Sequence, residues 1–413
     1  MDSPVLILGA GTFGLSTAYH LSEAGWTNIT VLDKAESIPS KYSAGYDLNK
    51  IVRAEYPDSF YSELALTAIN AWKTPLFAPY YRETGYLITN SENAPEKTID
   101  TLRRFRASIA SNPAFSAAIS SVETREDIHK FAPAFYGPAK GWKGYFNKLA
   151  GYARAADAMG ALYKHCAARG VRFELGDAVT DLLYSADGKC IGATTASGKK
   201  YASNLTIMTL GACAASVLPS IGRHQKALGV PVAHVQVTPE EAARLKGMPV
   251  TFCRDLGFLF EPDPETCLIK LCPANGGYIY FGEGSDMSLP PSRTDEFTFT
   301  PKDDEERLRQ LLRDILPDLA DRPFVGTRFC WFMDTKDHDY IIDFVPGTEG
   351  LVVVSGDSGH GYKMLPVIGS WVLKLIKEGR QGIARWKWKG DEERTEVSLR
   401  AFPTRDLMDQ SLR

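Results

Sequence analysis

The stretch that decides the fold is residues 3–34, SPVLILGAGTFGLSTAYHLSEAGWTNITVLDK. Its apolar run at 5–8 predicts a short buried strand, and a glycine-rich turn at 9–14 follows directly. Residues 15–24 carry apolar side chains at helical spacing, and a second apolar run at 29–32 predicts another strand. Strand, turn, helix and strand in this order are typical of the first βαβ unit of a parallel sheet that binds a dinucleotide.

Four residues of this unit match the G-x-G-x-x-G fingerprint and the acid that follows it. Gly9 allows the tight turn, Gly11 lets the backbone approach a pyrophosphate, and Gly14 lets the helix pack on the strand. Asp33 ends the second strand, where a carboxylate binds a ribose hydroxyl. The alternative, an ordinary glycine-rich turn, accounts for the glycines but not for the complete order of elements.

The composition is that of a globular chain of two or three domains, or of one large domain with insertions. Its 413 residues are 44% hydrophobic and 23% charged, with a net charge of -3. This charge argues against a nucleic-acid surface, and no apolar run approaches the roughly 20 residues of a membrane span. Seven cysteines without a C-x-x-C pair, and no leader before the first strand, predict a reducing, cytoplasmic setting. A peroxisomal location is the alternative, although the C-terminal Gln-Ser-Leu-Arg is not a clean signal.

The rest of the chain shows helical and strand patterns in alternation. The pattern predicts, in order, a helix over 58–76, a strand pair over 78–90, charged helices over 96–131, an amphipathic helix ending at 170, a strand over 171–176, a hairpin over 178–196, a buried strand and short helix over 206–220, mainly strands over 225–325 with a helix over 303–316, and a strand, glycine-rich turn and helix over 351–379.

Three later motifs resemble the D-amino-acid-oxidase superfamily of flavoproteins, within its sarcosine oxidase and fructosyl amino acid oxidase branch. SAGYDLNKI (43–51) resembles the fructosyl amino acid oxidase motif. RFCWFMDTKDHDYIID (328–343) is similar to the sarcosine oxidase segment that carries covalent flavin, and SGDSGHGYKMLP (355–366) resembles the C-terminal flavin loop of both groups. The resemblance covers nearly the whole chain, and some features resemble saccharopine and pipecolate oxidases.

The resemblance implies an α/β fold with an FAD-binding Rossmann-like domain of the glutathione-reductase type. The second domain is expected to be an α+β substrate domain with a mixed or antiparallel sheet. The expected boundaries are 1–85, 146–220 and 326–385 for the discontinuous FAD-binding domain, 86–145 and 221–325 for the substrate-binding domain, and 386–413 for a tail that wraps the surface.

Three residues of these motifs are expected to act on the flavin. Cys330 matches the cysteine that this branch bonds to the flavin ring, and Arg328 would favour its thiolate; a core cysteine is the alternative. Lys270 matches the lysine that promotes the reaction with oxygen, and it stands in an apolar strand where an unpaired ammonium would be costly. Lys50 is expected at the flavin edge as the second catalytic lysine. The residues expected to bind FAD are Gly9, Gly11, Thr12, Phe13, Gly14, Asp33, Lys34, Ser43, Lys50, Cys330, Asp357, Gly359, His360, Gly361 and Lys363.

Arg53 and Lys363 match the pair that holds the substrate carboxylate in sarcosine oxidase-like enzymes, and Tyr362 is expected to bind substrate with them. An arginine fork and a lysine point charge together favour an amino-acid carboxylate, whereas either alone is more often a surface charge. The sequence departs from its relatives at Ala274, where sarcosine oxidase has a histidine and the fructosyl enzymes a glutamate. The sequence thus combines the DLNK motif (47–50) of the fructosyl enzymes with the RAEY motif (53–56) of sarcosine-type enzymes. This combination does not support the sugar-binding part of the fructosyl function.

These residues predict an FAD-dependent oxidase of secondary amines. The substrate would be an N-substituted amino acid of the fructosyl, N-methyl, saccharopine or pipecolate type, oxidised to an imine that water hydrolyses while oxygen becomes hydrogen peroxide. A dehydrogenase with another electron acceptor and a non-catalytic flavin-binding protein are the alternatives. The N-substituent, the oxidised carbon and the oligomeric state stay open; a monomer is the expectation, and no metal is expected.

Overall fold

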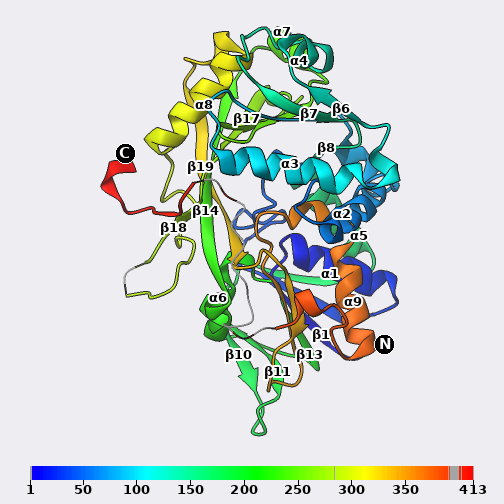
Figure 1. Ribbon diagram of the computed structural model, residues 1–413. Coiled ribbons are helices and arrows are strands. Elements are labelled where there is room, and N and C mark those ends of the chain that lie inside the picture. Colours follow the sequence, from blue (N-terminus) through cyan, green and yellow to red (C-terminus); the bar gives the residue numbers. More distant parts are fainter. Residues whose placement is uncertain (1, 283, 389, 391–399, 401, 413) are drawn as a thin grey trace.

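The computed structural model describes residues 2–282, 284–388, 390, 400 and 402–412. Two large sheets organise this part of the chain (Figure 1). Their order of helices and strands gives the mixed α/β fold that the sequence predicts.

The first sheet has six strands and contains the fingerprint unit. Its order is β20 (Ile341–Phe344), β21 (Leu351–Ser355), β13 (Leu205–Met208), β1 (Val5–Leu8), β2 (Ile29–Asp33) and β9 (Arg172–Leu175). All neighbours are parallel except β20, which pairs antiparallel with β21. Every residue of β1 is buried, because layers cover both faces of the sheet.

Three helices cover one face of this sheet, and a small sheet covers the other. The helices are α1 (Thr12–Glu23), α5 (Ala155–Ala168) and α9 (Ile368–Glu378), which lie together at the lower right of Figure 1. A Cβ on Gly369 would lie 2.0 Å from the Ser16 carbonyl oxygen, so glycine permits the close packing of α9 on α1. The opposite layer consists of β10 (Val179–Tyr184), β11 (Cys190–Thr195) and β12 (Lys200–Ala202), followed by α6 (Ala214–Val217).

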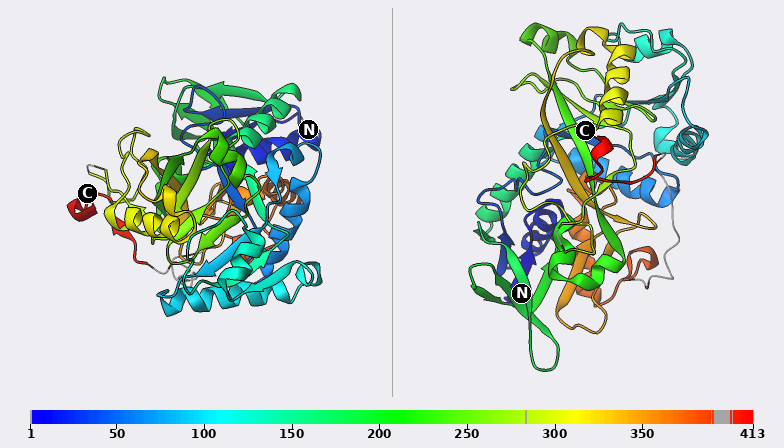
Figure 2. Two further views of the ribbon diagram at one scale, coloured as in Figure 1. Left: turned by 90° about the horizontal axis from the view of Figure 1, so that it is seen from above. Right: turned by 90° about the vertical axis from the view of Figure 1, so that its left-hand side faces the viewer.

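The second sheet has ten strands. Nine follow the order β22 (Arg405–Asp406), β18 (Tyr278–Ile279), β14 (Gln225–Gln236), β17 (Leu268–Pro273), β16 (Gly257–Leu259), β15 (Val250–Cys253), β5 (Tyr86–Asn90), β7 (Lys143–Asn147) and β6 (Ile119–Val122), and the tenth, β19 (Phe324–Thr335), pairs with β14. The long strands β14 and β19 run from the level of the first sheet to the far end of the molecule (Figures 1 and 2).

Helices cover the ten-stranded sheet, and the chain forms a second small sheet of three strands. The helices are α2 (Ser59–Trp72), α3 (Glu96–Ala110), α4 (Arg125–Phe131), α7 (Pro239–Leu245) and α8 (Lys302–Ile315). The small sheet has the order β3 (Asn49–Val52), β8 (Gly151–Arg154), β4 (Tyr81–Arg82).

Several local predictions are wrong, and each error has a tertiary cause. The strands β4 and β5 do not pair with each other, because β4 pairs with β8 and β5 lies between β7 and β15. The predicted helical stretch 96–131 is interrupted by β6, an edge strand whose exposed face carries polar residues. The first residues of the predicted helix that ends at 170 form β8, and α5 begins only at Ala155.

The predicted surface tail is also wrong in part. Trp386 is 0% exposed and its ring packs 4.8 Å from that of Trp371, while β22 joins the edge of the ten-stranded sheet. Residues 389, 391–399, 401 and 413 of the predicted tail lie outside the described residues. The predicted division into two domains and a tail stays a prediction.

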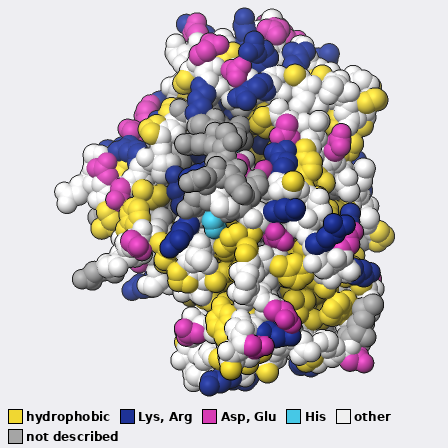
Figure 3. All heavy atoms as spheres, turned by 60° about the horizontal axis from the view of Figure 1, so that its bottom comes forward, with side chains coloured by type: hydrophobic (Ala, Val, Ile, Leu, Met, Phe, Trp, Pro, Cys, Tyr) yellow, Lys and Arg dark blue, Asp and Glu magenta, His cyan; other side chains and the backbone are white. Residues whose placement is uncertain are grey.

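Acidic and basic side chains are interspersed on the molecular face shown in Figure 3. Among the described helices, none combines the length and the apolar character needed to cross a bilayer.

Candidate active site

Two cavities meet at the N-terminus of α1. The smaller has a volume of about 210 Å³ and the larger about 330 Å³. Both are lined by Thr12, Phe13, Ala44 and Asp357. The two cavities therefore form a continuous site for an elongated ligand, between the carboxyl ends of the parallel strands and the ten-stranded sheet.

The smaller cavity is built from the fingerprint turn. Asp33 Oδ2 accepts a hydrogen bond from the Ala10 amide at 2.8 Å, and Oδ1 accepts from the Ala35 amide and the Ser40 hydroxyl at 2.8 and 2.9 Å. A Cβ on Gly14 would lie 1.8 Å from the Gly9 oxygen, so helix and strand touch there as predicted. Of the predicted residues, this cavity is lined by Gly9, Gly11, Thr12, Phe13, Asp33, Lys34, Ser43 and Asp357.

The start of α1 fits a phosphate group. Gly11 is the N-cap of this helix, and no side chain caps it. Thr12 and Phe13, the first helical residues, line the cavity. Uncapped amides with the positive end of the helix dipole favour an anion at this position.

A buried carboxylate, Asp47, holds three cations beside the larger cavity. Its Oδ2 lies 2.6 Å from Lys270 Nζ and 2.9 Å from Lys50 Nζ, and its Oδ1 lies 3.2 Å from the Arg328 guanidinium. Burial alone would raise the pKa of Asp47, but the charges of these three cations hold it well below its usual range. Asp47 is thus ionised, and it is the partner of Lys270, which the sequence places in an apolar strand where an unpaired ammonium would be costly.

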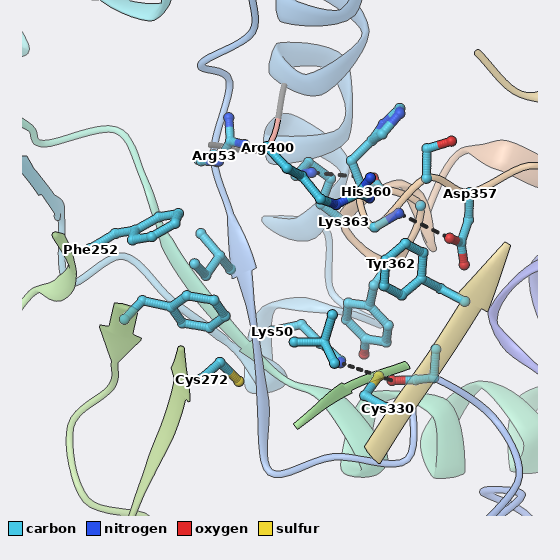
Figure 4. A pocket seen from close by; sticks show the side chains of 18 of the residues that line it. Lys50, Arg53, Phe252, Cys272, Cys330, Asp357, His360, Tyr362, Lys363 and Arg400 are labelled. Carbon is cyan, nitrogen blue, oxygen red and sulfur yellow. Dashed lines mark hydrogen bonds between the residues drawn. The ribbon is translucent and has the colours of Figure 1, made fainter. Parts of the chain in front are cut away.

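Cys330 lies next to this cluster. Lys50 Nζ donates to Cys330 Sγ at 3.3 Å, a contact drawn in Figure 4, and the Ala44 carbonyl lies 3.7 Å from the same sulfur. The predicted flavin-edge lysine and the predicted attachment cysteine are therefore neighbours, although 280 residues separate them in sequence.

Arg53 and Lys363 both line another part of the cavity wall and are labelled in Figure 4. Lys363 Nζ donates to the Tyr56 hydroxyl at 2.9 Å and to the His360 carbonyl at 3.2 Å. The Arg53 guanidinium lies 5.3 Å and Lys363 Nζ 5.2 Å from the centre of the Tyr56 ring. Neither cation makes an ion pair with a described residue, and burial without a partner holds the pKa of Lys363 well below its usual value.

The C-terminal loop contributes rings and one carboxyl group. His360 Nδ1 lies 2.9 Å from the Tyr340 hydroxyl, and Nε2 lies 2.9 Å from the His338 carbonyl, which requires a donor at Nε2. Burial holds the pKa of His360 well below its usual value, so the ring is neutral. Tyr362 donates its hydroxyl to the Ala155 carbonyl and presents its ring to the cavity, and burial raises the pKa of Asp357 to about 7.

The larger cavity brings together most of the predicted site residues from distant segments. They are Thr12, Phe13, Lys50, Arg53, Lys270, Cys330, Asp357, Gly359, His360, Gly361, Tyr362 and Lys363. Gly14 is the one predicted glycine that acts through packing alone, since it lines neither cavity.

Three residues that matter in the cavity are absent from the predicted set. Asp47 stands inside the DLNK motif, so its position was a usable signal. Arg254 follows an apolar strand, and Arg400 comes from the tail, where it pairs with Asp334 at 2.6 Å. Nothing in the local sequence marks these two arginines. Within the described part of the chain, no group of His, Cys, Asp or Glu is suited to a metal ion.

Comparison with known proteins settles the family. The model of the family described as DAO, FAD dependent oxidoreductase, matches residues 4–375. The chain belongs to the FAD-dependent oxidoreductase family. It is 33% identical to L-saccharopine oxidase of Schizosaccharomyces pombe, over 99% of this chain and 98% of the relative. It is 24% identical to peroxisomal sarcosine oxidase of Mus musculus, over 90% of this chain and 91% of the relative.

A solved structure shares the fold of this FAD-dependent oxidoreductase. The deglycating fructosamine oxidase of Aspergillus fumigatus, Amadoriase II, matches with a TM-score of 0.89 and 33% identity, covering 99% of this chain and 96% of that one. The predicted superfamily, its oxidase branch and the fold class are thus confirmed. FAD is the family's cofactor, and the two joined cavities, with an uncapped helix at their junction, fit an elongated dinucleotide.

Replacing Asp47 by asparagine should destabilise the protein by about 3 kcal/mol or more, because three neighbouring cations lose their counter-charge. Asp47 has a lowered folded pKa, so it adds stability above its unfolded value of about 4 and loses it as the pH falls further. Urea unfolding of wild type and Asp47→Asn should therefore differ at pH 7, and this difference should begin to shrink only below pH about 4 and go on shrinking as the pH falls further.

Asp181→Asn is the matched control, since this aspartate is exposed on β10. It should unfold like wild type at both pH values. Equal stability of Asp47→Asn and wild type at pH 7 would contradict the assigned role of the cluster.

Proposed function

We propose that the protein is an FAD-dependent oxidase of secondary amines that acts on N-substituted α-amino acids. The observation that carries the proposal is the meeting of Arg53 and Lys363, without an acid partner among the described residues, in the cavity that also contains Lys50, Lys270 and Cys330. Oxygen as the acceptor, a monomeric state and a cytoplasmic location belong to the proposal as well.

The substrate carboxylate would lie between Arg53 and Lys363. The Arg53 guanidinium can accept it in a fork, and Lys363 is aimed by the Tyr56 hydroxyl at 2.9 Å. An anion at this position restores the pKa of Lys363, which burial has lowered, so binding keeps the ammonium protonated. The carboxylate would thereby fix the α-carbon and the nitrogen relative to the wall of the cavity.

The cations of the cavity also favour the neutral form of the substrate amine. A cavity lined by several cations lowers the pKa of a bound amine, which favours the neutral form that has a free electron pair. FAD, when bound, accepts a hydride from the carbon next to that nitrogen. Phe252, Phe258 and Phe260 line the cavity and exclude water from the reacting carbon until the product imine is released for hydrolysis.

Lys270 would serve the reaction with oxygen. Its side chain is 1% exposed, and Asp47 at 2.6 Å and the Asn49 carbonyl at 2.7 Å hold its ammonium in place. A fixed cation in a buried site stabilises negative charge that forms on oxygen during its reduction.

Cys330 would attach the flavin covalently. The sulfur would bond to a methyl carbon of the flavin ring, with loss of the thiol proton and of one methyl proton; the two electrons would go to the flavin itself, and oxygen would then reoxidise it. The Lys50 ammonium at 3.3 Å would stabilise negative charge on the sulfur while this bond forms. The FAD-dependent relatives provide the cofactor assignment, and the bond to Cys330 is the proposed addition.

The purified protein should release hydrogen peroxide with at least one member of a panel of N-substituted amino acids. The panel is sarcosine, N-methyl aromatic amino acids, pipecolate, saccharopine and fructosyl-valine. Because Arg53 and Lys363 bind the carboxylate, the matching N-alkyl amines without it should be poor substrates. Flavin bleaching without oxygen, measured in parallel, separates an oxidase from a dehydrogenase: bleaching without peroxide release in air would contradict the oxidase.

Lys270→Met should slow reoxidation of the reduced flavin by oxygen by about 100-fold or more, while reduction by substrate under anaerobic conditions changes far less. Stopped-flow absorbance measures both steps. Lys226→Met replaces an exposed lysine of β14; it is the matched control and should reoxidise normally. Reoxidation of Lys270→Met at the wild-type rate would remove this lysine from the oxygen reaction.

Cys330→Ser should release all flavin into the supernatant after acid precipitation, whereas wild type should retain it in the pellet. Cys272→Ser tests whether the effect is specific, because Cys272 lines the same cavity. Flavin retained by Cys330→Ser, or released by wild type, would overturn the covalent link.

A further inference from the structure

Three cations form a row along one wall of the larger cavity. Arg53 stands in the middle: it shares the Tyr56 ring with Lys363 and the Phe105 ring with Arg254. The guanidinium carbons of Arg53 and Arg254 lie 5.0 and 4.9 Å from the centre of the Phe105 ring. Lys363, Arg53 and Arg254 are called the cation row below.

The cation row has no anionic partner among the described residues. The buried Nη1 of Arg53 and the buried Nε of Arg254 make no hydrogen bond there, and none of the three cations makes an ion pair. This differs from Lys50, Lys270 and Arg400, which line the same cavity but are paired with Asp47 or Asp334. A buried, unpaired guanidinium is costly, and such a group is expected where a ligand completes the site.

The nearest carboxyl groups do not balance the cation row. The charge of Glu55 acts on Arg53 and Lys363, but Glu55 makes no ion pair with either among the described residues. Its Oε1 accepts from the Asn147 amide at 2.7 Å, its buried Oε2 has no hydrogen-bond partner there, and burial raises the pKa of Glu55. Asp255, next to Arg254 in sequence, is occupied by the amide and hydroxyl of Ser91. Burial and the charge of Arg53 lower the pKa of Arg254 to about 10, a repulsion that a bound anion would relieve.

One bound α-carboxylate would neutralise only part of the positive charge of the cation row. A carboxylate between Arg53 and Lys363, as in the proposed function, leaves the Arg254 side of the Phe105 ring unneutralised. The wall around Arg254 is otherwise aromatic, since its guanidinium also lies 5.1 Å from the Phe252 ring centre. Methylene groups fit such a wall, and a single charged terminus fits the guanidinium.

We propose that Arg254 forms a second carboxylate subsite, so that the substrate is a dicarboxylic secondary amine with its second acid group at the end of an alkyl arm. The inference rests on the proposed function, because the first carboxylate is the one that Arg53 and Lys363 hold. Arg254 is then a residue that determines specificity: it selects the charged arm and takes no part in the oxidation.

Calorimetric titration of the FAD-loaded protein with non-oxidisable acids tests the subsite without turnover. The series from succinate to pimelate is compared with monocarboxylates of equal length. The best dicarboxylate should bind wild type about 10-fold or more tightly than its monocarboxylate, because a charge-assisted hydrogen bond is gained. Arg254→Gln should lose this preference, Arg254→Lys should keep part of it, and Arg103→Gln, an 80% exposed arginine on α3, should keep all of it.

Stability separates a binding role from a structural one. Without ligand, Arg254→Gln should unfold at the same temperature as wild type or higher, because an unpaired buried charge is removed. A lower unfolding temperature, together with equal loss of affinity for both acid classes, would show that Arg254 supports the fold and would overturn the subsite.

Kinetics distinguish this inference from the proposed function. Two pairs of substrates differ in whether the arm ends in a carboxylate: N-methyl-L-glutamate against N-methyl-L-glutamine, and N-(3-carboxypropyl)glycine against N-butylglycine. In at least one pair, the wild-type enzyme should have a higher kcat/KM for the dicarboxylate. Arg254→Gln should abolish this difference, mainly through KM. Turnover of N-alkyl amino acids with no dicarboxylate preference would overturn the subsite and keep the oxidase. A dicarboxylate preference in binding, with no turnover of any panel member, would keep the subsite and overturn the oxidase.

Discussion

The ionised carboxylate of Asp47 is the interaction on which the site depends. It is buried in the loop before β3, and its partners come from three strands: Lys50 from β3, Lys270 from β17 and Arg328 from β19. β17 and β19 flank β14, where Lys270 lies opposite His234 and Arg328 opposite Val232. One carboxylate thus ties the loop that leaves the first sheet to β17 and β19, two of the strands that pair with β14. Any displacement of this loop would leave buried cations without a counter-charge, so the loop is held at a fixed position.

The cavity has two parts, which differ in whether their cations are paired with acidic residues of the protein. Near Cys330 the cations are paired within the protein, so their positions are set before any ligand arrives. Along the cation row they are unpaired, so their charge is available to a ligand. Preorganised charge suits a region that must hold a reactive ring and stabilise developing charge, because no reorganisation is needed during the reaction. Uncompensated charge suits recognition, because the binding energy appears only when the right anion neutralises it.

Sequence reasoning succeeded where the signal was local. The β1–α1–β2 unit follows from periodicity and glycine spacing within about thirty residues, and the motifs around Lys50, Cys330 and Lys363 place those residues in one cavity.

Prediction from the sequence failed where a distant partner decides the outcome. The polarity of 96–131 is typical of charged helices, yet β6 within it is an edge strand that, among the described strands, pairs with β7 alone. The sequence indicates that an unpaired Lys270 would be costly in its apolar strand, but it does not reveal that the partner is Asp47, 223 residues away. Arg254 and Arg400 carry no motif at all, and only the assembled cavity reveals them.

The alanine at position 274, where relatives have a histidine or a glutamate, can be understood from this difference between paired and unpaired cations. Ala274 lines the cavity with Phe258 and Cys272 and offers no acceptor for the hydroxyl groups of a sugar. The positive row of Arg53, Lys363 and Arg254 is presented instead, in a wall built of aromatic rings. Recognition of sugar hydroxyls needs acceptors as well as donors at fixed positions, whereas the cation row supplies donors only, in an apolar wall. Arg254 and Phe105 belong to segments separate from those that bear Lys50, Lys270 and Cys330. The substrate arm that the cavity accepts can therefore change without displacing the residues proposed to act on the flavin. A fold shared with deglycating enzymes can therefore recognise a charged arm while the residues beside the cofactor keep their places.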